Sequence, residues 1–188
     1  MTRQILLALF VAGSFLAGLA IAQTPAAATK VLMKTSKGDI TIELYASKAP
    51  VTVKNFLSYV KDGFYAGTTF HRVMPGFMIQ GGGMTAEMHE KPAKPSIRNE
   101  SGNGLTNARG SIAMARTEDL NSATCQFYIN LVDNFRLDEL KYCAFGKVVA
   151  GMDVVDAIAK VKTTTKRGNE NVPVEPVTIL SVEVLGAK

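Results

Sequence analysis

The sequence predicts a mainly β fold in which an antiparallel barrel closes on itself and is capped by two α-helices. Three observations support this expectation: short runs of alternating apolar and polar residues recur, only two segments have helical spacing, and glycine-rich turns separate the runs. Many short strands with few helices are typical of closed β architectures. A length of 188 residues, without an internal repeat or a linker, fits one domain with a buried core.

The first expected element is a β-hairpin formed by residues 30–36 and 39–45. In its second strand three aliphatic residues alternate with polar ones, a pattern that buries one face of a hairpin. A helix is expected over residues 50–62, because a proline opens the segment, apolar side chains recur along one stripe, and a glycine follows.

Residues 81–110 are poor in apolar side chains and rich in glycine and proline, which predicts a long loop region. The three consecutive glycines at 81–83 lack the Gly-Lys-Ser/Thr of a phosphate loop, so we expect a sharp turn or a close backbone approach there. The elements expected after this loop are strands at 111–115, 126–131 and 144–149, a second helix at 152–161 and a last strand at 177–185.

Composition argues against several function classes. The formal net charge is +5, and no block of Lys and Arg is interleaved with aromatic residues, so we expect no nucleic-acid binding. The two His and two Cys have no paired ligand spacing, which argues against a metal. Cys125 and Cys143 lie in apolar, strand-like segments typical of buried free thiols; a disulfide between them is the alternative in an exported protein. A monomer is the default expectation.

Residues 1–22 have the composition of a secretory signal peptide. A basic residue precedes an apolar stretch, and Ala20-Ile21-Ala22 forms a small-x-small cleavage site. We expect cleavage after this site, a flexible leader over residues 23–29, and one folded domain over residues 30–188. The alternative is that residues 5–22 stay uncleaved and anchor the protein in a membrane.

The most informative stretch of the chain is Phe70–Gly82, which contains Arg72, Met78 and Gln80. If the turn at Pro75-Gly76 preserves strand parity, these three side chains share one face. A guanidinium and an amide then flank an apolar cup, an arrangement that predicts a binding site.

This stretch closely resembles the signature of the cyclophilins, the cyclosporin-binding family of peptidyl-prolyl cis-trans isomerases. Segments 107–117, 121–130, 137–138 and 144–152 extend the resemblance over most of residues 30–185. The resemblance implies that the barrel has eight strands and that residues 30–188 are an isomerase domain. It also implies a peptide groove formed by Arg72, Phe77, Met78, Gln80, Ala115, Arg116, Gln126, Tyr128, Leu137 and Tyr142.

Rotation about an X-Pro bond needs no nucleophile, metal or cofactor. The barrier is about 18–20 kcal/mol because the C–N bond has partial double-bond character. A donor aimed at the proline nitrogen stabilises the twisted state, in which the lone pair is localised there. Arg72 suits this role because its guanidinium stays charged, whereas a surface ion pair is its ordinary alternative. Phe77 and Met78 would line the proline cup or simply pack in the core, and Gln80 would bond the peptide or be a satisfied buried amide.

Hydrolytic catalysis is not expected from this sequence. His71 lies inside the signature strand and points opposite to Arg72 if alternation holds, and His89 lies in the polar loop. Neither histidine has a neighbouring nucleophile of the kind a Ser-His-Asp or Cys-His mechanism requires. Paired carboxylates likewise have no local signature here.

Several groove positions differ from those of many eukaryotic cyclophilins. Arg116 and Tyr128 stand where those proteins have Asn and Phe, and Tyr142 stands in place of a pocket His. The cyclosporin-contacting Trp would fall near Phe135 or Arg136, so its indole N–H donor is absent. These differences resemble the bacterial branch of the family and predict weak cyclosporin binding.

The sequence therefore predicts an exported, periplasmic isomerase that rotates X-Pro bonds in unfolded or partly folded polypeptides and assists their folding. Uncatalysed rotation takes tens to hundreds of seconds, which is slow enough to limit folding. No cofactor is expected, nor stable membrane association after signal cleavage. One alternative is a non-catalytic module of cyclophilin fold that binds proline-containing peptides; another is a structural protein tethered by residues 5–22.

Overall fold

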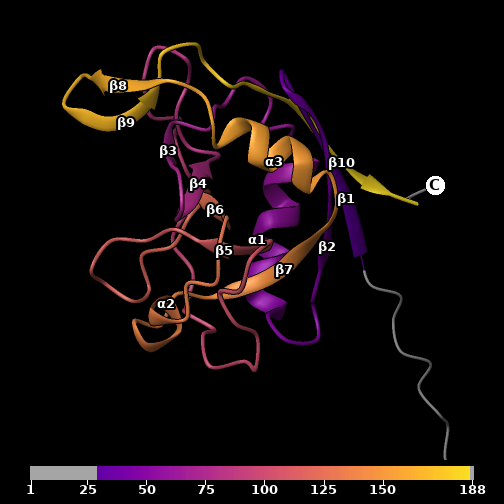
Figure 1. The fold of residues 1–188 in the computed structure, drawn as a ribbon. Helices are drawn as coiled ribbons and strands as arrows, with labels where there is room; N and C mark the ends of the chain where they lie inside the picture. Colours follow the sequence, from indigo (N-terminus) through magenta and orange to yellow (C-terminus); the bar gives the residue numbers. More distant parts are fainter. Residues whose placement is uncertain (1–28, 187–188) are drawn as a thin grey trace, which may run out of the picture.

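The computed structural model describes residues 29–186, so the expected signal peptide at 1–22 and nearly all of the expected leader lie outside the described residues. Its main feature is an eight-stranded antiparallel sheet with the order β10-β1-β2-β7-β5-β6-β4-β3 (Figure 1). The strands are β1 (Thr29–Thr35), β2 (Gly38–Leu44), β3 (Arg72–Met74), β4 (Met78–Gly81), β5 (Ser111–Met114), β6 (Phe127–Asn130), β7 (Ala144–Ala150) and β10 (Ile179–Leu185).

Backbone hydrogen bonds between residues 67–70 and 177–179 join the two ends of this sheet. The Phe70 amide donates to the carbonyl of Val177 over 2.9 Å, and the Ile179 amide donates to the carbonyl of Thr68 over 2.7 Å. Residues 67–70 precede β3, and residues 177–179 lead into β10, whose first residue is Ile179, so closure is made at the edges of these two strands. The expectation of an eight-stranded antiparallel barrel is confirmed.

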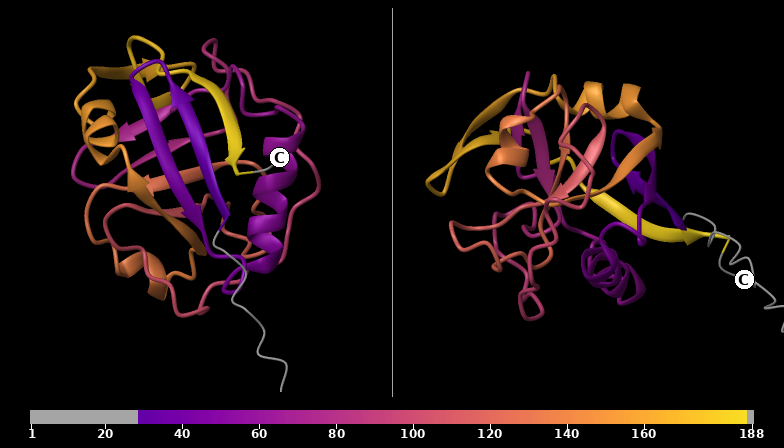
Figure 2. Two further views of the ribbon diagram at one scale, coloured as in Figure 1. Left: turned by 90° about the vertical axis from the view of Figure 1, so that its right-hand side faces the viewer. Right: turned by 90° about the horizontal axis from the view of Figure 1, so that it is seen from below.

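Two of the helices were expected, and they contribute to one core. α1 (Pro50–Lys61) packs beside β10, and α3 (Met152–Ile158) packs beside β2 (Figure 2). Phe56 of α1 lies at the centre of the core, with ring centroids 5.1 Å from Tyr65 and 5.4 Å from Phe145. Burial of such aromatic side chains makes the barrel interior a packed core.

Besides the two expected helices, the structure has a third, α2 (Arg136–Glu139), which stands between β6 and β7. Its four residues form a single turn, too short for a helical period to appear in the sequence. A separate hairpin, β8 (Thr163–Lys166) with β9 (Asn169–Pro173), was also not expected. All four residues of β8 are exposed, so no apolar alternation marks it.

The long loop region expected over residues 81–110 contains only isolated bridges outside the end of β4. Its three glycines serve a close approach, as expected, but to other parts of this chain. A Cβ at Gly82 would lie 2.7 Å from the ring of Phe127, and a Cβ at Gly83 would lie 2.4 Å from Cγ of Gln126. The loop can therefore lie directly against β6 and the segment before it.

Glu100 of this loop caps the start of α1, which has no capping side chain of its own. The two carboxylate oxygens accept the amide protons of Val51 and Thr52 over 3.1 and 2.8 Å. Oε2 also accepts from the Thr52 hydroxyl over 2.9 Å. A carboxylate at a helix N-terminus satisfies orphan donors and the helix dipole together, so this contact fixes the loop on the helix.

Both cysteines, Cys125 and Cys143, are buried free thiols, and burial raises the pKa of each. Within residues 29–186, no cluster of three or more His, Cys, Asp or Glu side chains is arranged to hold a metal ion. The helices described for residues 29–186 include none with the length and apolar character needed to cross a membrane.

Candidate active site

The site lies on the outer face of the barrel wall formed by β3, β4, β5 and β6. Alternation along β4 sends Ile79 into the core and Met78 and Gln80 to the outside, and along β6 it sends Ile129 inward and Tyr128 outward. Met78 and Tyr128 belong to a small second apolar cluster separate from the barrel core. One sheet therefore supports the core on one face and the site on the other.

The hairpin of β3 and β4 brings the signature residues together. Arg72 pairs directly with Gln80, and Met74 pairs with Met78, so these four side chains share one face. Gly76 occupies the intervening turn with φ 73°, which favours a glycine. The predicted common face of Arg72, Met78 and Gln80 is therefore present in the structure.

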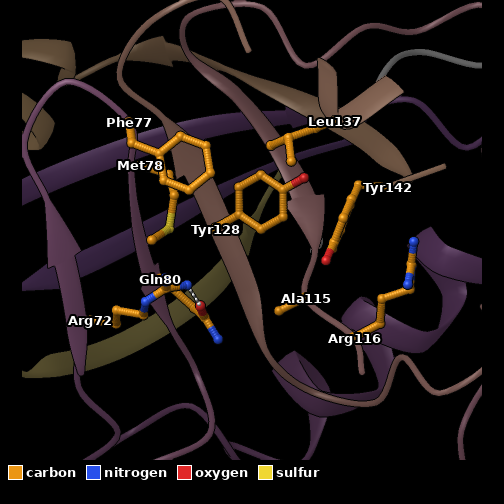
Figure 3. Close-up of a pocket in the computed structure, with 9 residues that line it drawn as sticks. All are labelled: Arg72, Phe77, Met78, Gln80, Ala115, Arg116, Tyr128, Leu137 and Tyr142. Atoms are coloured by element: carbon orange, nitrogen blue, oxygen red, sulfur yellow. Dashed lines mark hydrogen bonds between the residues drawn. The ribbon is translucent and has the colours of Figure 1, made fainter. Parts of the chain in front are cut away.

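A cavity of about 380 Å³ opens on this face, and we call it the Arg72 pocket (Figure 3). Nine of the ten residues named from the sequence line it, and no other described residue does. The lining residues are Arg72, Phe77, Met78, Gln80, Ala115, Arg116, Tyr128, Leu137 and Tyr142. The tenth, Gln126, lies just outside and lines two neighbouring pockets instead.

Arg72 is held by a short chain of side-chain amides. Its Nη1 donates to Oε1 of Gln80 over 3.4 Å, and Nε2 of Gln80 donates to Oε1 of Gln126 over 2.9 Å. Among residues 29–186 no carboxylate lies within 4.0 Å of the guanidinium, so the surface ion pair considered as its ordinary role is not present. The half-buried cation therefore has donors free for a ligand.

The remainder of the pocket is mostly apolar. Figure 3 shows Phe77 and Met78 on the side of Arg72, Tyr128 in the centre, and Leu137 and Tyr142 on the opposite side. We call Tyr128, Leu137 and Tyr142 the tyrosine wall. The two tyrosine rings meet edge to face with centroids 6.0 Å apart. A proline ring suits such a surface because the methylene groups of the ring make only apolar contacts.

Arg116 closes the end of the pocket away from Arg72 (Figure 3). Its guanidinium carbon lies 4.2 Å from the ring centroid of Tyr142, a cation–π contact. The same group donates to the carbonyls of Thr117, over 2.7 Å, and of Leu140. The guanidinium of Arg116 is therefore engaged by the Tyr142 ring and by backbone carbonyls, whereas that of Arg72 keeps donors for a ligand.

Neither histidine has the surroundings of a catalytic base in the Arg72 pocket. His71 is buried beside a neighbouring polar pocket of about 400 Å³, and burial lowers its pKa to about 4. His89 is exposed in the loop. The site thus combines one free guanidinium, amides and an apolar cup, which suits conformational rather than hydrolytic chemistry.

Comparison with known proteins identifies the class. Residues 30–184 match the family described as cyclophilin type peptidyl-prolyl cis-trans isomerase/CLD. The chain belongs to this family, and its enzyme class is peptidyl-prolyl cis-trans isomerase.

Similar relatives include bacterial isomerases. A peptidyl-prolyl cis-trans isomerase of Acinetobacter baylyi is 54% identical over 173 residues, covering 90% of this chain and 92% of the relative. Peptidyl-prolyl cis-trans isomerase B of Escherichia coli is 52% identical over 161 residues, covering 82% and 98%. A solved cyclophilin of Cryptosporidium parvum matches with a TM-score of 0.73 at 24% identity over 86% of this chain and 99% of that one, which supports the fold.

Proposed function

We propose that the Arg72 pocket is the active site and that it catalyses rotation about X-Pro bonds in polypeptides exported from the cytoplasm. The observation that carries the proposal is the guanidinium of Arg72, which has no carboxylate partner in the described chain and lies beside the apolar side chains of a cavity of about 380 Å³. Support also comes from a relative in the family, a cyclophilin of Cryptosporidium parvum crystallised in the presence of the dipeptide Ala-Pro.

In this proposal the proline ring packs on Phe77, Met78 and the tyrosine wall. The acyl side of the bond then rotates while the ring stays held. Conjugation is lost at the twisted state, and the lone pair localises on the proline nitrogen. An N–H of Arg72 donates to that nitrogen and stabilises the twisted state more than either planar state.

The amide chain behind Arg72 has a definite role in this proposal. Gln80 accepts from the guanidinium and is itself oriented by Gln126, so the donor is positioned before the substrate arrives. Preorganisation of a donor avoids reorganisation during the reaction. A reduction of the barrier by about 7 kcal/mol corresponds to roughly 10⁵-fold acceleration. No metal or cofactor takes part.

We further propose that the enzyme acts in the periplasm on unfolded or partly folded chains that contain X-Pro bonds. The signal-peptide composition of residues 1–22 is the basis for this localisation. Rotation of X-Pro bonds is slow enough to limit folding, and its catalysis consumes no ATP, which suits an exported enzyme. Determination of the mature N-terminus tests the export step: Gln23 as first residue supports it, and a retained Met1 contradicts it.

The alternative within the same fold is a module that binds proline-containing peptides without turnover. Arg72→Ala separates the two, because it removes the proposed donor and leaves the apolar cup. We expect turnover of a short X-Pro peptide to fall about 10²- to 10³-fold, with peptide affinity changed by less than about threefold. Unchanged turnover in the variant would remove Arg72 from the mechanism. Absence of turnover in folded wild-type protein would favour the binding module.

A further inference from the structure

Directly behind the tyrosine wall lies a side chain that does not line the Arg72 pocket. Asn107, in the segment before β5, has an exposed fraction of 0%. A polar side chain with no contact to water must find all of its hydrogen-bond partners within the protein. Two of its partners, Tyr128 and Tyr142, belong to the tyrosine wall, and a third, Asp138, is next to Leu137 in the chain.

The carboxamide of Asn107 uses its complete hydrogen-bonding capacity. Its Oδ1 accepts from the Tyr128 hydroxyl over 2.7 Å and from Nδ2 of Asn130 over 3.1 Å. Its Nδ2 donates to Oδ1 of Asp138 over 2.7 Å and to the carbonyl of Tyr142 over 3.2 Å. An amide offers two donor hydrogens and two lone pairs, so no capacity remains for a ligand.

The main chain of Asn107 bonds to the same region. Its amide donates to Oδ1 of Asp138 over 2.9 Å, and its carbonyl accepts from the Asn134 amide over 2.8 Å. Asp138 is adjacent to Leu137 within α2. One residue therefore connects to both tyrosines of the wall and to the helix that carries its leucine.

Tyr128 is already positioned by its place in β6, but Leu137 and Tyr142 lie outside the sheet and depend on such connections. α2 has four residues, none of them buried, and no side-chain cap at its N-terminus. A single helical turn is not stable alone, so its place depends on tertiary contacts. Tyr142 is only half-buried, and it follows Lys141, whose φ of 61° places that residue in the left-handed region.

We propose that Asn107 is a positioning residue of the isomerase, which sets the shape of the proline cup by fixing Tyr128, Leu137 and Tyr142 against β4. The inference rests on the proposed function of the Arg72 pocket. Asn107 touches neither substrate nor Arg72, so it acts only through the wall. The wall contacts the proline ring equally in the planar and twisted states. Loosening the wall therefore weakens ground-state and transition-state binding alike, which raises KM and leaves kcat nearly unchanged.

The test compares Asn107→Ala with Asn55→Ala by steady-state kinetics on a saturable X-Pro peptide and by thermal unfolding. Asn55 is also buried and donates to the Thr124 carbonyl over 2.6 Å, but its side chain has no bond to the tyrosine wall. We expect Asn107→Ala to raise KM about tenfold with kcat within about threefold of wild type. Asn55→Ala should lose thermal stability while its KM stays within about twofold of wild type.

Asp138→Ala provides an independent variant should Asn107→Ala not fold. It removes the carboxylate that accepts from the main-chain amide and from Nδ2 of Asn107, and we expect it to raise KM about threefold. The inference is overturned if neither variant raises KM more than Asn55→Ala does, or if either lowers kcat with KM unchanged. Arg72→Ala in the same series separates the proposed active site from the positioning role. Full turnover by Arg72→Ala contradicts the proposed active site itself. Loss of turnover in Arg72→Ala together with unchanged kinetics of Asn107→Ala contradicts only the positioning role of Asn107.

Discussion

Acidification should destabilise this protein through His71, the residue that precedes the proposed donor. His71 has an exposed fraction of 7%, and its Nδ1 has no hydrogen-bond partner. Burial, assisted by the charge of Arg72, lowers its pKa from the ordinary 6.5 to about 4. The other titratable side chain of the adjoining pocket is Glu170, contributed by β9.

The size of the effect follows from the two pKa values. Between pH 6.5 and about 4 the unfolded chain binds a proton at His71 that the folded chain does not bind. The free energy of unfolding therefore falls as the pH is lowered through this window. A difference of about 2.5 pKa units corresponds to about 3 kcal/mol in the free energy of unfolding. This contribution to stability is fully present above pH 6.5 and fully lost below pH 4.

Urea denaturation followed by circular dichroism at pH 7, 5.5 and 4 measures this directly. Carboxylates titrate in the same range, so the informative quantity is the difference between wild type and His71→Gln. We expect the variant to lose about 3 kcal/mol less than wild type between pH 7 and pH 4. His89→Gln is the control, because His89 is exposed. Parallel curves for wild type and His71→Gln would refute the argument that a buried neutral imidazole resists protonation.

Three further predictions concern the surroundings of the site. Glu100→Ala leaves two amide donors of α1 without partners and should lower the free energy of unfolding by about 3 kcal/mol. Calorimetry should then show a Tm about 6–12 °C lower. In the control Glu118→Ala, which changes an exposed side chain, the free energy of unfolding should fall by less than about 0.5 kcal/mol. Gly83→Ala places a Cβ 2.4 Å from Cγ of Gln126, which should break the bond to Gln80 and lower kcat/KM about tenfold; an unchanged kcat/KM would show that this bond is not needed. Cyclosporin should inhibit weakly, because the chain has no Trp to donate an indole N–H, and submicromolar inhibition would contradict this.

The sequence predicted the strands and the common face of the signature because both depend on local geometry. Alternation in β2 determines which side chains enter the core, whatever the remainder of the chain does. In the signature hairpin, Arg72 and Gln80 face each other because the turn between Met74 and Met78 holds three residues and keeps their pairing in register. The nine lining residues follow from that register together with the family resemblance.

The sequence could not predict features that depend on distant partners. The single turn of α2 and the short strands β8 and β9 contain no periodic apolar pattern. The sequence also gives no sign of the role of Asn107, because an asparagine in a loop segment usually contacts water. Only the folded chain shows that the four hydrogen bonds of its carboxamide reach β6, α2 and the carbonyl of Tyr142.

The structure also gives one physical reason for two differences noted separately in the sequence. The family resemblance places Arg116 and Tyr142 where many eukaryotic cyclophilins have Asn and His, and in the fold the Arg116 guanidinium carbon lies 4.2 Å from the ring centroid of Tyr142. A guanidinium on a tyrosine face gains cation–π attraction, while its bonds to the carbonyls of Thr117 and Leu140 fix its plane. The two replacements therefore act as one unit that closes the pocket end. Since this unit leaves the free cation of Arg72 at the other end, the proposed chemistry is compatible with both changes.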